Sequence, residues 1–181
     1  VVNLQKKWRN VSMMLYHGTN IDIQSIDLAL CRPYKDFGKG FYTTEILEQA
    51  QKMAKRVARI YGGNPIVNMY EIADNYKENS GLNILDFGRN PSERWAVFVM
   101  NNRSKGFTDF GCLDCNFDYK YDIVTGPIAD DDMTVLFRQY QNRMISFETL
   151  LKGITFRETT SQCSFHTEKA VQLLRKVGVL Q

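Results

Sequence analysis

The sequence predicts an α+β fold in which mostly antiparallel strands are flanked by helices. Candidate strands and helices follow one another without the regular strand-helix-strand alternation that a parallel sheet requires. Residues 46–61 place apolar side chains at three- and four-residue steps, which is the period of an amphipathic helix. The chain has 181 residues, of which 44% are hydrophobic, enough for one core and short for two. We therefore expect one domain over residues 13–181, preceded by an N-terminal extension over residues 1–12.

Strands are expected where β-branched and aromatic residues combine with alternating or continuous apolar patterns. The segments with this composition are 13–17, 66–73, 82–87, 121–125 and 161–166. Residues 22–34 and 106–116 lack such patterns, and we expect loops there.

Each expected helix follows a residue that can cap its N-terminus. Thr44 is the expected cap of the first helix, and Gly62 with Gly63 is expected to end it. The other helices are expected over residues 95–101, opened by Asn90-Pro91-Ser92-Glu93, over residues 133–139, after three aspartates, and from the cap Thr167 through Val177.

Charge and hydropathy limit the classes of partner. The 23 basic and 20 acidic residues nearly balance, so the net charge of +3 gives little support to nucleic-acid binding. No apolar run approaches the roughly 20 residues of a membrane span, and no secretory signal pattern opens the chain. We expect a cytoplasmic protein that has no membrane partner.

A metal site is not expected. Cys112 and Cys115 have the two-residue spacing of a zinc pair, but no second pair or closely spaced His couple supplies two more ligands. The cysteines are expected to be reduced thiols, with Cys163 buried in a strand. Asp130, Asp131 and Asp132 have the composition of a cation site, but we expect them to cap the following helix.

Two short runs carry the strongest functional signal. The first is Leu15-Tyr16-His17-Gly18-Thr19-Asn20, and the second is Asp36-Phe37-Gly38-Lys39-Gly40-Phe41-Tyr42-Thr43-Thr44. Glycine lets the main chain approach a ligand closely, while His and Tyr supply hydrogen bonds and a flat ring. Together the runs predict a pocket for a planar, polar ligand, although each residue taken singly has an ordinary structural interpretation.

These runs, with a polar residue on a late strand, resemble the three motifs of ADP-ribosyltransferases of the diphtheria-toxin and poly(ADP-ribose) polymerase type. Within that superfamily the chain is most similar to a bacterial group known as DUF3990, a domain of unknown function, over about residues 15–174. The segments that carry this likeness are 36–44, Glu93-Arg94-Trp95-Ala96 with Asn102-Arg103, 121–131 and 161–170.

The resemblance implies a split β-sandwich that binds NAD as its substrate, without a metal. Nicotinamide would be released, and ADP-ribose would pass to a macromolecular acceptor, expected to be a protein. Gly18 would hold the nicotinamide amide through its backbone N–H and C=O, Tyr42 would stack on the ring, and His17 would bond a ribose hydroxyl. The implied NAD-binding residues are His17, Gly18, Thr19, Asn20, Phe37, Gly38, Gly40, Tyr42 and Thr44.

Gln162 occupies the third motif position, where polymerase-type members have glutamate. An amide keeps the hydrogen bond of glutamate and loses its charge, so elongation into a polymer is not expected. Mono-ADP-ribosylation, slow NAD hydrolysis and binding without turnover stay open. Glu168 is the nearest acid and the alternative third residue. His166 either lines the same pocket or ends its strand.

Two alternatives to this transferase remain at this point. One is a sensor module that binds NAD or ADP-ribose and does not catalyse, and another is an RNA 2′-phosphotransferase on the same fold. The second would show an additional His where this chain has Tyr42. Arg94 and Arg103 would meet either pyrophosphate or water. The acceptor would contact the segments 103–120 or 130–147, which are expected to contain variable loops.

Overall fold

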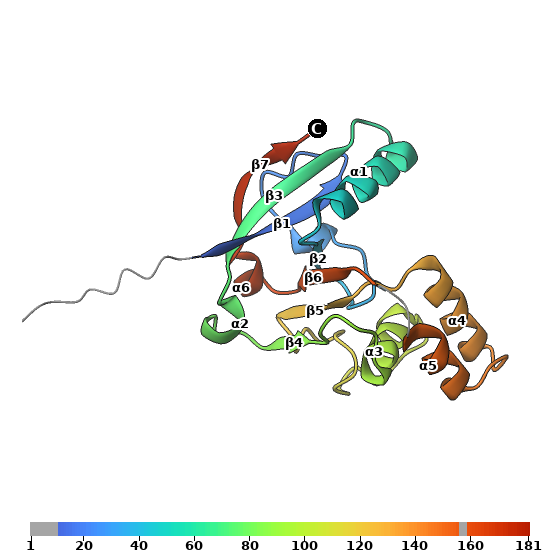
Figure 1. The fold of residues 1–181 in the computed structure, drawn as a ribbon. Helices are drawn as coiled ribbons and strands as arrows, with labels where there is room; N and C mark the ends of the chain where they lie inside the picture. Colours follow the sequence, from blue (N-terminus) through green and yellow to red (C-terminus); the bar gives the residue numbers. More distant parts are fainter. Residues whose placement is uncertain (1–10, 156–158) are drawn as a thin grey trace, which may run out of the picture.

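The computed structural model describes residues 11–155 and 159–181, so the expected extension lies almost entirely outside the described residues. The chain forms two open sheets with helices packed around them, and Figure 1 shows the two sheets as separate layers. The three-stranded sheet has the order β1-β3-β7, formed by β1 (Ser12–Thr19), β3 (Ile66–Ala73) and β7 (Arg175–Leu180). The four-stranded sheet has the order β2-β6-β5-β4, formed by β2 (Phe41–Thr43), β6 (Ser161–Phe165), β5 (Ile123–Pro127) and β4 (Ile84–Asp86).

The described helices lie between and beside these strands. They are α1 (Leu47–Tyr61), α2 (Tyr76–Asn79), α3 (Glu93–Arg103), α4 (Asp131–Gln141), α5 (Phe147–Thr155) and α6 (Glu168–Val171), with a 3₁₀ turn at Leu28–Leu30. All strand pairs are antiparallel except β4 with β5. The predicted α+β class with mostly antiparallel strands is therefore confirmed. Within the described ranges no helix has the length and hydrophobicity that a bilayer crossing requires.

Helix boundaries differ from the predictions at several caps. Helix α1 begins two residues later than expected, because the Thr44 hydroxyl accepts from the Ile46 N–H in a short turn. The cap of α3 is Ser92, whose Oγ accepts from the Trp95 N–H, so this helix begins at Glu93, two residues before the expected start. Helix α5 was not predicted from the sequence. Asp130 caps α4 as expected, accepting from the Met133 N–H at 2.7 Å.

The prediction of a helix through Val177 is wrong. Only one short turn, α6, follows Thr167, and residues 175–180 then form β7 along the edge of β3. The β-branched residues Val177 and Val179 favour this extended form. Arg175 pairs with Glu71 across the two strands, which adds a favourable cross-strand contact.

The two sheets meet where β1 passes the end of β2. The N–H of Tyr16 donates to the carbonyl of Thr44 at 2.8 Å, and the N–H of Thr44 donates back to Tyr16 at 3.0 Å. We call the region around this bridge, from Tyr16 to Gly18 on β1 and from Tyr42 to Thr44 on the β2 side, the sheet junction. It brings the two sequence motifs together.

Helix α1 packs on the junction through small residues. Ala50, Ala54 and Ala58 form its buried face, and in Figure 1 the helix lies along β1 and β3. A Cβ on Gly18 would lie 2.0 Å from the carbonyl oxygen of Ala50. This separation is far below van der Waals contact, so the helix can approach β1 this closely only because residue 18 is glycine.

His166 connects the end of β6 to residues 37–40, the turn before β2 that contains Gly38 and Gly40 and that we call the glycine turn. The ring is 3% exposed, with Nδ1 2.8 Å from the carbonyl of Lys39 and Nε2 2.8 Å from the hydroxyl of Ser164. A carbonyl only accepts, so Nδ1 carries the proton and Nε2 of the neutral ring accepts from Ser164. Burial lowers the pKa of His166 to about 4. His166 therefore ends its strand as a neutral structural contact.

Substituting Gly18→Ala should destabilise the fold by at least about 2 kcal/mol, because α1 must move away from β1 to admit the new methyl group. Urea unfolding followed by circular dichroism measures this loss. Gly106→Ala is the control, since a Cβ there would meet no described atom within 4 Å. Equal stability of the two variants would contradict the packing described.

Stability should fall as the pH drops from about 6.5 to about 4. The folded-state pKa of His166 lies below its unfolded value, so the unfolded chain binds the proton first as the pH falls. Acidification therefore stabilises the unfolded chain relative to the folded protein. The contribution of neutral His166 to the free energy of unfolding is fully present above the unfolded pKa of about 6.5. At most about 3 kcal/mol of this free energy is lost by pH 4. Unfolding free energies of wild type and His166→Asn across this range measure it. The difference between the two proteins should shrink with acidity, and a constant difference would contradict the assignment.

Candidate functional site

His17 is held by β1 with one ring nitrogen engaged and one free. Its Nδ1 lies 2.7 Å from the carbonyl of Tyr42, and its ring stacks on Phe41 with a centroid separation of 4.4 Å. Burial lowers the pKa of His17, so the imidazole is neutral at pH 7. Because the carbonyl must accept, Nδ1 carries the proton and Nε2 presents a lone pair. No described residue bonds to Nε2.

Gly18 directs its backbone groups toward the β2 side of the sheet junction. Both backbone groups of Tyr16 point toward Thr44, and residues two apart on a strand point the same way, so the N–H and C=O of Gly18 face β2 as well. The antiparallel ladder with β3 consequently uses the residues on either side of Gly18. Continuing the Tyr16 register places Gly18 opposite Tyr42. No described residue bonds to these two groups on the β2 side, although Gly18 is buried.

The phenol of Tyr42 is fixed across the glycine turn. Its oxygen accepts from the Phe37 N–H at 3.0 Å and donates to the Gly38 carbonyl at 2.7 Å. Burial and the nearby Asp36 carboxylate raise the pKa of Tyr42 well above its usual range. The residue is therefore not equipped to act as an acid or base, and it is half-buried.

Gln162 shares a face of the four-stranded sheet with Tyr42. Tyr42 pairs with Ser164, so Gln162, two residues away on β6, is its diagonal neighbour, a position about 7–8 Å distant. Its Nε2 donates to Asp36 Oδ2 at 2.9 Å and to the Pro127 carbonyl at 3.5 Å. Both partners only accept, so the amide nitrogen faces them and Oε1 is the outward atom. No described residue bonds to Oε1.

Asp36 and Arg103 form an ion pair behind Gln162. Arg103 Nη2 lies 2.6 Å from Asp36 Oδ1, and Arg103 Nε donates to the same oxygen at 2.8 Å. The Ala129 N–H donates to Asp36 Oδ2 at 3.2 Å, and Arg103 Nη1 donates to Thr134 at 2.8 Å. Sequence reasoning missed the role of Asp36, although the residue begins the second motif. Arg103, expected to meet pyrophosphate or water, is used in this ion pair.

Several other predicted ligand-binding residues have structural contacts. Phe37 lies in the core, Gly38 has a φ of +91° that a side chain would strain, and Gly40 leaves room for the His166 ring. Asn20 donates to the Gly62 carbonyl at the end of α1, and the Thr44 hydroxyl donates to Ser161.

Three residues lie apart from this set. Thr19 ends β1 and is partly buried, and Glu168, the alternative acid, is exposed in α6. Arg94 pairs at 2.9 Å with Asp114, where both side chains are largely exposed. Among the sequence-predicted residues, the structure thus gathers His17, Gly18, Tyr42 and Gln162 around the junction.

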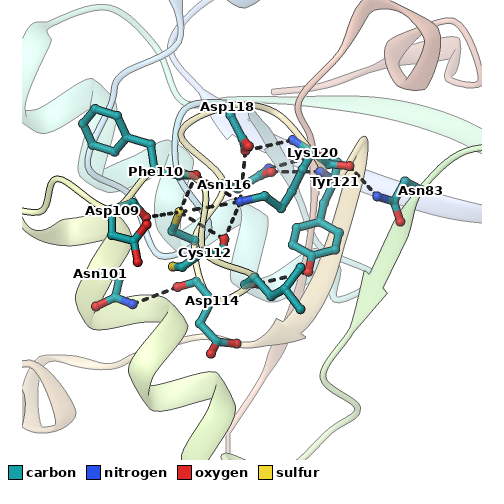
Figure 2. Close-up of polar contacts among 12 residues, drawn as sticks. Asn83, Asn101, Asp109, Phe110, Cys112, Asp114, Asn116, Asp118, Lys120 and Tyr121 are labelled. Atoms are coloured by element: carbon teal, nitrogen blue, oxygen red, sulfur yellow. Dashed lines mark hydrogen bonds and ion pairs between the residues drawn. The ribbon is translucent and has the colours of Figure 1, made fainter.

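The loop of residues 109–121 packs next to the glycine turn, with Asn116 near Gly38. Figure 2 shows the Lys120 side chain directed into this loop, where Nζ donates to the carbonyls of Phe110 and Cys112 and lies 3.2 Å from Asp118. A Cβ on Gly38 would lie 3.1 Å from Asn102 Oδ1, the same atom that accepts from the Asn116 N–H. Asn102 on α3 and Asn116 in the loop therefore leave little space for a side chain at residue 38.

The cysteines have structural surroundings. The thiol of Cys115 is buried, donates to the Phe110 carbonyl at 3.3 Å, and has its pKa raised by burial. Cys163 is buried in β6, as predicted. In residues 11–155 and 159–181 no group of three or more His, Cys, Asp or Glu side chains is placed to hold a metal ion.

Comparison with known proteins gives a family and no activity. No curated protein and no solved structure matches the chain. The model of one family, described as "Protein of unknown function (DUF3990)", matches residues 13–175. Because this match covers most of the chain, the protein belongs to the DUF3990 family.

Proposed function

We propose that the protein binds NAD at the sheet junction, releases nicotinamide and transfers ADP-ribose to a protein acceptor. The observation that carries the proposal is the N–H and C=O of Gly18, which have no described partner and lie opposite Tyr42 in the continued strand register. Buried backbone groups almost always have partners, so a buried pair without one favours a ligand there. The resemblance of the motifs to ADP-ribosyltransferases points to the same site.

The nicotinamide ring suits these groups in two ways. Its carboxamide has one acceptor and one donor side, which complement the N–H and C=O of a single residue. A flat, electron-poor ring also stacks well on a phenol. Gly18 would fix the amide while Tyr42 covers one face of the ring. The Tyr42 hydroxyl, tethered to Phe37 and Gly38, keeps that face in place.

Two neutral acceptors are available for ribose hydroxyls. His17 Nε2 and Gln162 Oε1 each have a free lone pair, and a hydroxyl is a donor that both can accept from. In the reaction the C1′–N bond breaks, nicotinamide leaves with the electron pair, and an acceptor nucleophile bonds to C1′ and loses a proton. The sugar passes through an oxocarbenium-like state, which an amide stabilises less than a carboxylate. We therefore propose slow mono-ADP-ribosylation or NAD hydrolysis rather than polymer synthesis.

A second candidate function is NAD or ADP-ribose sensing without turnover. The observation that favours it is the charge balance of the site, because the carboxylate of Asp36 is paired with Arg103 and does not face the ligand position directly. Binding would then be retained while bond cleavage is lost.

Replacing His17→Ala should weaken NAD binding about tenfold, because a ribose hydroxyl loses one acceptor, a loss of about 1.4 kcal/mol. Isothermal titration calorimetry measures the change. Lys52→Ala, on the exposed face of α1, is the control and should bind as wild type does. Absence of NAD binding by wild type would overturn the proposed function, and equal affinities of His17→Ala and wild type would overturn the role of His17.

Nicotinamide release separates the two candidate functions. Incubation of the protein with NAD, followed by chromatography, should show slow release that Tyr42→Ala reduces at least tenfold through loss of ring stacking. Tyr42→Phe keeps the ring and loses the tether, so its reduction should be smaller. NAD binding without detectable release would leave the sensor and exclude the transferase.

A further inference from the structure

We propose that Asp36 is a positioning residue that orients Gln162, so that the third motif function is divided between two side chains. In this arrangement Asp36 fixes the amide of Gln162 in one orientation, and Gln162 makes the contact with a ribose hydroxyl. The inference deepens the proposed function and rests on it for the identity of the ligand. The contact between the two side chains stands independently of any ligand.

The partners of Asp36 identify it as the fixed member of the pair. The residue is 7% exposed, and its described contacts are Nε and Nη2 of Arg103, the Ala129 N–H and Nε2 of Gln162. All four are donors, the set that an ionised carboxylate accepts. A buried carboxylate held by an arginine and a backbone amide cannot move without losing these charge-assisted bonds.

Gln162 is held in one amide orientation by this carboxylate. The opposite orientation would turn Oε1 toward Asp36 Oδ2 and the Pro127 carbonyl, placing three acceptors together without a proton. The observed orientation turns Oε1 away from these two acceptors, and no described residue bonds to it. An amide that rotated freely would present its NH₂ group and its oxygen in turn to a ribose hydroxyl. The fixed Gln162 amide presents only its oxygen, which accepts a hydrogen bond as a glutamate oxygen would.

The same geometry accounts for glutamine at this position. A glutamate at residue 162 would put a second carboxylate about 3 Å from Asp36, and like charges so close disfavour ionisation of both groups. Moving the charge from residue 36 to residue 162 would avoid this conflict. An asparagine at residue 36 can donate through Nδ2 to a glutamate at residue 162, and the total charge of the cluster with Arg103 is unchanged. The Ala129 N–H, which shares Asp36 Oδ2 with Gln162, would lose its acceptor in this exchange.

A charge-exchange cycle tests the inference. The variants are Gln162→Glu, Asp36→Asn and the double variant, each made in the full chain, with Gln162→Met as a folded control that lacks the amide. Each single variant should lose at least tenfold in nicotinamide release. The double variant should release nicotinamide several-fold faster than either single variant, since the hydrogen bond between residues 36 and 162 is re-formed with donor and acceptor exchanged. It should remain slower than wild type, because the Ala129 N–H has lost its acceptor. Additive losses in the double variant would overturn the inference.

A second readout needs no NAD. Urea unfolding is measured for wild type, Gln162→Glu, Asp36→Asn and the double variant. The unfolding equilibrium constants should show a coupling of at least tenfold between residues 36 and 162. The side-chain NH₂ signals of Gln162 in a ¹⁵N-labelled sample should be protected from exchange in wild type. Coupling with no NAD binding would overturn the proposed function and leave the positioning role standing. NAD turnover by wild type with no coupling would overturn the positioning role alone.

Discussion

The pair of backbone hydrogen bonds between Tyr16 and Thr44 joins the two sheets and determines what lies beside them. Two residues further along β1 the strands no longer bond, so Gly18 keeps its place in the sheet but has backbone groups directed at the gap. Had β1 and β2 continued as a regular pair, those groups would have been satisfied by the main chain. The candidate site is therefore a consequence of where the two sheets separate, and its side chains are arranged around that point.

The junction is held rigid from three sides. Helix α1 covers Gly18 at a separation that only a glycine allows, and His166 fixes the carbonyl of Lys39 ahead of β2. Below them, the Asp36–Arg103 ion pair connects the glycine turn to α3 and holds Gln162. Because core packing and polar contacts act on the same short stretch, the proposed ligand would require little rearrangement of the junction. Such preorganisation reduces the cost of binding and is typical of ligand sites.

Local patterns in the sequence were sufficient for some parts and insufficient for others. His17 and Tyr42 each lie in a short continuous motif, and the resemblance of these two motifs to a family predicted both residues. The structure brings the two residues into contact. The contact between Asp36 and Gln162 spans 126 positions, and nothing near either residue indicates it. The last strand was missed for a similar reason, because residues 175–180 follow a well-capped helix start, and the β3 edge that makes them extended lies about a hundred positions earlier.

The most direct test of the junction is a titration with nicotinamide observed at the backbone amide of Gly18 by ¹H–¹⁵N NMR. Nicotinamide alone contains the carboxamide and the ring, so it probes the unpaired groups without ribose or acceptor. The account predicts a saturable downfield shift of the Gly18 amide proton, reduced in Tyr42→Ala, as the N–H acquires an acceptor. A Gly18 signal that stays unchanged while nicotinamide or NAD binds elsewhere on the chain would contradict it.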